Sequence, residues 1–237
     1  MNFELDSARC STLALNCFDG GKFFKFLFGV VIFPYVLYLF VATHLGWTRK
    51  RKKTPTQHFE SIVRALSSAT LLWLLGNYEE TFDKITFTFT IIGILLFGFV
   101  AEKLKDTHEH TLATMHKWNG SMKTVVFIVL LALAAVAVHH IHLATEISEE
   151  FRNVYVLCGF IPVFLVYLAT KTAEMENRRN EGTKLLFHLH HVHLFYALAF
   201  FTRFPEFFSR VAAGLFLGAS LHGAAAFEND RSFDRIY

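Results

Sequence analysis

The chain has 237 residues, of which 53% are hydrophobic and only 18% are charged. Its mean hydropathy of +0.37 is above that of ordinary soluble domains of this size, which argues against a water-soluble globule. The net charge of +3 comes from basic residues spread over separate loops, so the composition also argues against nucleic-acid binding.

The segment before the first long apolar run is interrupted by charged residues between Glu4 and Asp19. It therefore lacks the apolar core of a cleavable signal peptide, and we expect the first membrane span to direct insertion. A disulfide between Cys10 and Cys17 requires this segment to face an oxidising compartment.

Seven apolar segments of the sequence meet or approach the roughly 20 residues that a helix needs to cross the hydrocarbon core of a bilayer. We expect an all-α, polytopic transmembrane helix bundle of about seven spans, folded as a single transmembrane domain over residues 1–237. The expected spans are residues 24–46, 58–76, 85–102, 122–144, 153–171, 185–203 and 207–227.

Polar residues and prolines distinguish individual spans. Glu60 and Arg64 lie about one helical turn apart near the start of the second segment, which could instead be an interfacial helix. Pro34 and Pro162 fall within spans and are expected to kink them, because proline removes a backbone hydrogen bond. Pro205 is expected to mark the start of the seventh span.

Lysine and arginine are distributed unequally between the loops on the two expected sides of the membrane. Fifteen of them lie on the side that holds the loop after the first span, and seven lie on the opposite side. Acidic clusters at residues 79–83 and 146–150 fall on the poorer side. Because basic loops favour the cytoplasm, we expect the N-terminus to be outside or lumenal and the C-terminus to be cytoplasmic.

Thirteen histidines are the most informative polar residues, and helical geometry sorts those within spans by depth. An inner cluster near the basic side combines His188 and His191, which share one face of the sixth span, with His222 of the seventh. His190 and His193 lie on nearly the opposite face of the sixth span. The three residues of the inner cluster are therefore candidate ligands for zinc, iron or haem.

An outer cluster is expected near the opposite membrane face, at the end of the fourth span. His139, His142 and Glu146 share one stripe of that helix and supply two imidazoles and one carboxylate. Such a set can bind zinc while one coordination position stays open for water. Neutral histidines within spans also join neighbouring helices by hydrogen bonds, and this packing role is the alternative for both clusters.

The seventh span contains small residues at helical spacing. Gly214 and Gly218 form a Gly-x3-Gly pair, and His222 follows four residues later on the same face. Because glycines allow two helices to approach closely, we expect His222 to be pressed against a neighbouring helix and not exposed to lipid.

Several of these features together resemble the transmembrane protein 45 family of small seven-span proteins. The resemblance depends on Glu60 at a helix entrance, His140 and His142 before an acidic loop, an apolar fifth span, and His222 in the seventh. It covers most of the chain and implies a bundle of seven helices. It implies no established biochemical activity.

Three functions are compatible with the sequence. The first is a non-enzymatic scaffold or accessory subunit of a larger membrane assembly, with the lipid bilayer and other membrane protein subunits as partners. The second is a metal- or haem-binding membrane enzyme or redox protein that uses the inner cluster. The third is a proton-coupled transporter with a histidine relay through His190 and His193.

Overall fold

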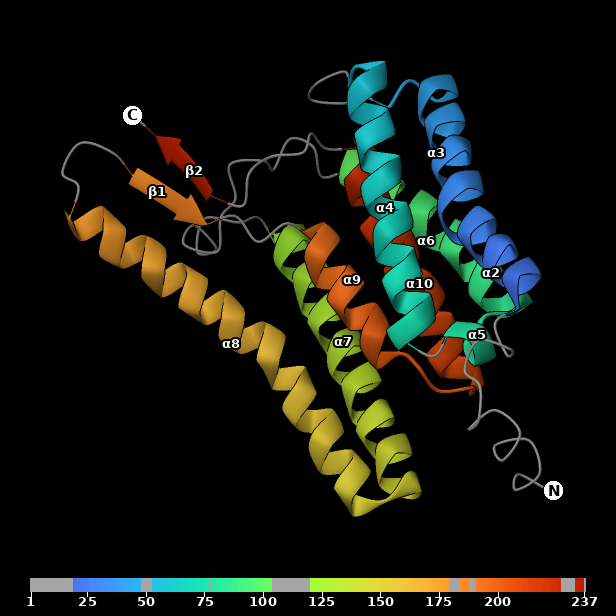
Figure 1. Ribbon diagram of the computed structural model, residues 1–237. Helices are drawn as coiled ribbons and strands as arrows, with labels where there is room; N and C mark the ends of the chain where they lie inside the picture. The colour runs from blue at the N-terminus through green and yellow to red at the C-terminus, as the bar shows by residue number, and fades with distance from the viewer. Residues whose placement is uncertain are drawn as a thin grey trace.

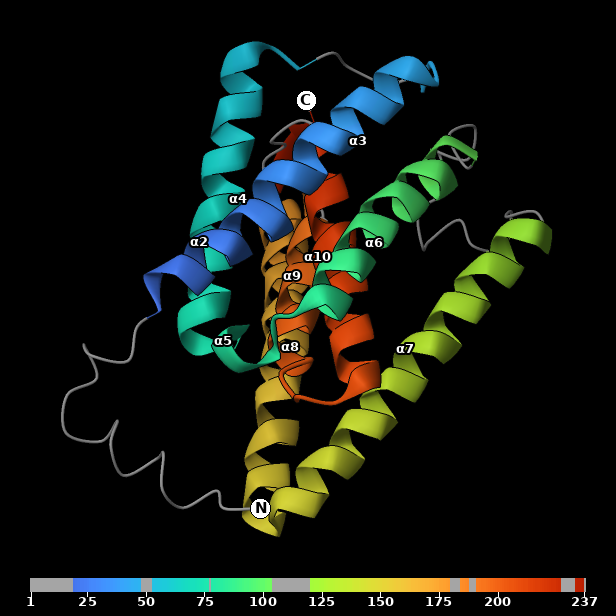
Figure 2. The same ribbon diagram turned by 90° about the vertical axis from the view of Figure 1, so that its right-hand side faces the viewer.

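The computed structural model describes residues 19–47, 53–76, 78–103, 120–179, 184–187, 191–226 and 233–236. These residues are mainly helical (Figures 1 and 2), and a helix lies within each of the seven expected segments. The helices are α2 (Gly20–Leu27), the π-helical η2 (Phe28–Ile32), α3 (Phe33–His44), α4 (Pro55–Leu75), α5 (Tyr78–Thr81), α6 (Lys84–Lys103), α7 (Gly120–Ile147), α8 (Glu149–Arg179), α9 (His191–Phe201) and α10 (Phe207–Ala226).

Three helical segments are long and apolar enough to cross a membrane. They are Gly20–His44, Lys84–Lys103 and Lys123–Ile147. These segments match the first, third and fourth expected spans, and they give the chain the character of a membrane protein.

The first of these segments joins α2, η2 and α3 into one continuous helix. The wider π-helical turn occupies residues 28–32, directly before Pro34. Proline lacks a backbone N–H and its ring crowds the carbonyl four residues earlier, so a local change of helical hydrogen bonding is the expected accommodation. The distortion that the sequence predicts near Pro34 is therefore present as a π-helical turn.

Among the described residues of the sixth expected span, 185–187 and 191–203, the helix is confined to the second part. α9 has 11 residues, which cover about 16 Å at the rise of an α-helix, and this is about half of a hydrocarbon core. Strand β1 (Lys184–Phe187) pairs in antiparallel fashion with β2 (Phe233–Ile236) instead of extending the helix. A short apolar run such as residues 185–187 fits a strand as well as a helix, which explains the difference.

The tightest packing in the described part of the chain joins α6 to α10. A Cβ atom added to Gly218 would lie 2.5 Å from the carbonyl oxygen of Thr90, and one added to Gly214 would lie 2.6 Å from that of Thr86. The two backbones thus touch along the Gly-x3-Gly pair, as the sequence predicts. His222 follows on the same helix, is 3% exposed and meets the ring of Tyr38 edge-on at 5.2 Å.

Segments far apart in the sequence meet at one end of the bundle, the lower end in Figure 1. Arg210 donates a hydrogen bond of 2.6 Å to Asp83, and Lys22 donates one to the carbonyl oxygen of Glu79. The turn between α7 and α8 lies at the same end (Figure 1). We call this the acidic end, and it contains the two acidic clusters at residues 79–83 and 146–150.

The opposite end is joined by different contacts. The ammonium group of Lys53 donates to the hydroxyl of Ser61 at 2.8 Å and to the carbonyl oxygen of Ala224 at 2.6 Å. A cation at this position also balances the negative end of the α10 dipole. The long helical segments of the described part of the chain alternate in direction between these two ends (Figures 1 and 2).

Helices α7 and α8 form a helical hairpin that stands apart from the other helices. In Figure 2 the long axis of α7 diverges from the remaining bundle, and in Figure 1 α8 extends away from it. Only 6% of the apolar window within Lys123–Ile147 is buried, compared with 44% within Gly20–His44. We call α7 and α8 the hairpin, and α2 to α6 with α9 and α10 the body.

Candidate functional site

The hairpin contacts the body through a polar cluster near the acidic end. His140 is 2% exposed, and its Nδ1 lies 2.7 Å from the carbonyl oxygen of Val136. Because a carbonyl oxygen only accepts, Nδ1 carries the proton and Nε2 accepts a hydrogen bond of 2.9 Å from the hydroxyl of Ser209. The backbone N–H of Phe204 donates to the same hydroxyl at 3.2 Å. His140 is thus a neutral side chain that joins α7 to α10.

A second histidine of α7 joins the same end of α10. Nε2 of His139 lies 3.1 Å from Oε2 of Glu206, which also accepts a hydrogen bond of 3.1 Å from the backbone N–H of Ser209. Burial raises the pKa of Glu206, but hydrogen bonds from the backbone of Phe208, from His139 and from the backbone of Ser209 outweigh it, so the pKa lies below its usual value. Glu206 therefore caps α10 and ties α7 to it.

The predicted outer cluster is divided between two partners. His142 pairs with Glu146 at 3.4 Å on the exposed face of α7, whereas His139 turns to Glu206. The structure therefore brings together two of the three predicted ligands and gives the third another partner. Within the described ranges, no group of three or more histidine, cysteine, aspartate or glutamate side chains is placed to hold a metal ion.

Only part of the predicted inner cluster lies within the described residues. His188 is not among them, and His191 is described only as the first residue of α9. His222 is buried against Tyr38. A metal or haem site at these residues stays a prediction.

The histidines of α7 and the histidine of α10 lie at different levels of the bundle. Ser209, which binds His140, and His222 are thirteen residues apart on α10, a distance of about 20 Å along the helix. The separation into two layers, which the sequence predicts from depth, is therefore found between His140 and His222.

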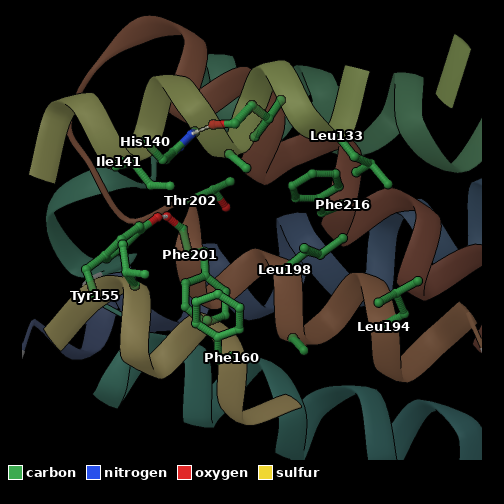
Figure 3. Close-up of a pocket in the computed structure, with 15 residues that line it drawn as sticks. Leu133, His140, Ile141, Tyr155, Phe160, Leu194, Leu198, Phe201, Thr202 and Phe216 are labelled. Atoms are coloured by element: carbon green, nitrogen blue, oxygen red, sulfur yellow. Dashed lines mark hydrogen bonds between the residues drawn. The ribbon is translucent and has the colours of Figure 1, made fainter. Parts of the chain in front are cut away.

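A cavity of about 310 Å³ lies beside this polar cluster, between the hairpin and helices α9 and α10 (Figure 3). Its walls are almost entirely apolar. Three polar side chains line it, and each already has a hydrogen-bond partner. His140 makes the contacts described above. Tyr155 donates a hydrogen bond to the carbonyl oxygen of Phe201, and Thr202 donates one of 3.0 Å to the carbonyl oxygen of Ala199. The cavity thus offers hydrocarbon surface and no unused hydrogen-bond donor from these three groups.

The sequence contained little signal for this site. The contacts of Ser209 and Glu206 with α7 join residues almost 70 positions apart, and no local pattern indicates them. Gly159, whose missing side chain leaves space in the cavity wall, stands in an ordinary apolar run.

The hydrogen bond between Ser209 and His140 has the length found between a catalytic nucleophile and its base. Ser209, however, is fully buried, accepts from the backbone and does not line the cavity. The pair therefore acts as a joint between helices.

Comparison of the chain with protein-family models, with curated proteins and with solved structures finds no match.

Proposed function

We propose that the chain is a seven-span membrane protein that acts as a non-enzymatic scaffold or accessory subunit, and that the hairpin is the surface that contacts another membrane protein. One observation carries this proposal. The segment Lys123–Ile147 is the most apolar of the three candidate spans, yet only 6% of its apolar window is buried within the chain. A helix of this kind needs an apolar environment that its own chain does not supply.

The proposed topology places the acidic end outside and the opposite end, with the basic loops, in the cytoplasm. Three helical segments meet the length and composition of a span, and the alternating direction of the helices supports the same count for the others. α9 covers only part of the bilayer, and its contacts with the body support its inclusion: Tyr196 donates to the carbonyl of Ser68, and Tyr78 to that of Ala199. The resemblance to the transmembrane protein 45 family implies the same architecture.

Small side chains on the outer surface of α7 favour a protein partner over lipid alone. Three exposed alanines that do not line the cavity lie close together at positions 132, 134 and 135. Small side chains give lipid chains no added contact, whereas they allow the backbones of two membrane helices to approach closely and associate. The larger exposed residues Phe127, Leu130 and Leu131 extend the same surface by more than one turn.

Photo-crosslinking in native membranes tests the proposal. A photoactivatable amino acid at Ala135 is expected to give a discrete adduct with a different membrane protein, whereas the same amino acid at the exposed Leu74 of α4 is expected to give lipid adducts. A probe at Leu131 is expected to give the same protein adduct, and the substitution Ala135→Leu is expected to remove it. The same substitution is expected to reduce the mass of the complex that mild detergent extracts. Lipid adducts alone at Ala135, or an adduct with a second copy of the chain, would contradict the proposed role.

A further inference from the structure

We propose that the cavity between the hairpin and α9–α10 binds one acyl chain of a bilayer phospholipid. This inference rests on the proposed membrane-spanning architecture, because it takes the surrounding bilayer as the source of the ligand. The proposed lipid site lies beside the hairpin, whose outer surface contacts the partner protein in the proposed function.

The size and the walls of the cavity fit a hydrocarbon chain. A volume of about 310 Å³ lies within the range of small-ligand pockets. Leu133, Leu194, Leu198 and Phe216 form one side of it (Figure 3), and apolar spaces of this kind exclude water. Two lining residues, Ile141 and Leu194, are also 37% and 38% exposed, so the cavity opens to the surface that faces the bilayer in the proposed architecture.

The polar groups at the acidic end of the cavity exclude a ligand that needs protein donors inside it. His140, Tyr155 and Thr202 lie together there (Figure 3) and each donates to a backbone carbonyl oxygen. Recognition within the cavity must therefore come from apolar contact. The half-buried Arg203 follows Thr202 at this end, and its guanidinium group is the cation that can pair with the phosphate of a phospholipid headgroup.

Gly159 provides a substitution that fills the cavity without disturbing the helix. A Cβ atom at this position would meet only the ring of Phe201, at 3.7 Å, which is ordinary van der Waals contact. The backbone at this position therefore accepts a Cβ atom, and Gly159→Leu improves helix propensity and extends a side chain into the space of the ligand. Leu157→Phe is the matched control, because Leu157 lies on the same helix, is 64% exposed and does not line the cavity.

The test uses the full chain in nanodiscs that contain phosphatidylcholine with a photoactivatable acyl chain. We expect labelling of Leu198 and Phe201 inside the cavity, a drop of about tenfold at these residues in Gly159→Leu, and no change in Leu157→Phe. Equal labelling of the cavity in Gly159→Leu would overturn the inference.

Labelling of the outward-facing Leu130 separates this inference from the proposed architecture. If Leu130 is labelled and the cavity residues are not, the lipid site is overturned and the architecture stands. If neither is labelled, both are overturned. A parallel sample with a photoactivatable free fatty acid identifies the source of the chain, since labelling of the cavity by the fatty acid alone would overturn phospholipid as the ligand.

Discussion

Helix α7 of the hairpin is as apolar as helices α6 and α10 of the body, but the two regions are held in place by different means. In the body, α10 lies against α6 with backbone touching backbone at Gly214 and Gly218. The hairpin reaches the body mainly through side chains near the acidic end, such as His140 and Tyr155, and a cavity separates the two regions. Hydrophobicity thus places helices in a bilayer, whereas small residues and polar contacts decide which helices pack together.

The largest effect is expected from adding a methyl group where α6 and α10 touch. In Gly218→Ala the added methyl group would lie 2.5 Å from backbone atoms of Thr90 and Ile94, which cannot move without shifting α6. We expect a loss of about 3 kcal/mol in the free energy of unfolding, measured by thermal or denaturant unfolding in detergent. Gly120→Ala is the control, because no atom lies within 4 Å of its added Cβ. Equal stability of the two variants would refute the close approach.

A smaller effect is expected from removing the histidine that joins the hairpin to α10. His140→Ala leaves the buried hydroxyl of Ser209 without its acceptor, at a cost of about 1–3 kcal/mol. We expect faster hydrogen exchange in α7 and α8 and little change in α6. His142→Ala serves as the control, since this side chain is exposed and pairs with Glu146 of the same helix. Faster exchange spread evenly over the body would argue against a separate hairpin.

Two tyrosines allow the same chemical change to be made in each region. Tyr78→Phe removes a buried hydrogen bond to the carbonyl of Ala199 within the body, and Tyr155→Phe removes one to the carbonyl of Phe201 at the hairpin. Each loss is expected to cost about 1 kcal/mol. Tyr78→Phe should lower the stability of the whole bundle, whereas Tyr155→Phe should raise hydrogen exchange only in the hairpin. Identical exchange patterns would erase the distinction between the regions.

The smallest expected effect is a pH dependence at the acidic end. The pKa of Glu206 lies below its ordinary value of 4.5 in the folded protein, so its carboxylate stabilises the fold above that pH. This stabilisation is lost as the pH falls from 4.5 through the lowered pKa, and it is modest because the side chain is partly exposed. Hydrogen exchange of α7 should therefore increase in this acidic range. The increase should be absent in Glu206→Gln and present in Glu146→Gln, and a reversed pattern would contradict the assigned role of Glu206.

Features of the fold that depend on local composition could be predicted from the sequence. The long apolar runs predict the positions of the helices, and the Gly-x3-Gly pair predicts the close packing of α10 with burial of His222. The length of α9 could not be predicted, because the apolar residues 185–187 suit a strand or a helix equally well.

The candidate site was less accessible to sequence reasoning because its contacts are long-range. His139 has Glu146 about two turns away on its own helix, yet it pairs with Glu206, which directly precedes α10. His139, His142 and Glu146 recur at helical spacing along α7, but the approach of α10 decides which partner His139 takes. The cavity likewise exists only through the relative placement of four helices.

Distance measurements between spin labels test most directly whether the hairpin is held less firmly than the body. Pairs would be placed at exposed positions in a cysteine-free background in nanodiscs: Leu74 with Ile92 within the body, and Leu130 with Ile92 between hairpin and body. We expect a narrow distance distribution for the first pair and a broad one for the second, which narrows in native membranes where the partner is present. Equally narrow distributions for both pairs in nanodiscs would contradict the account.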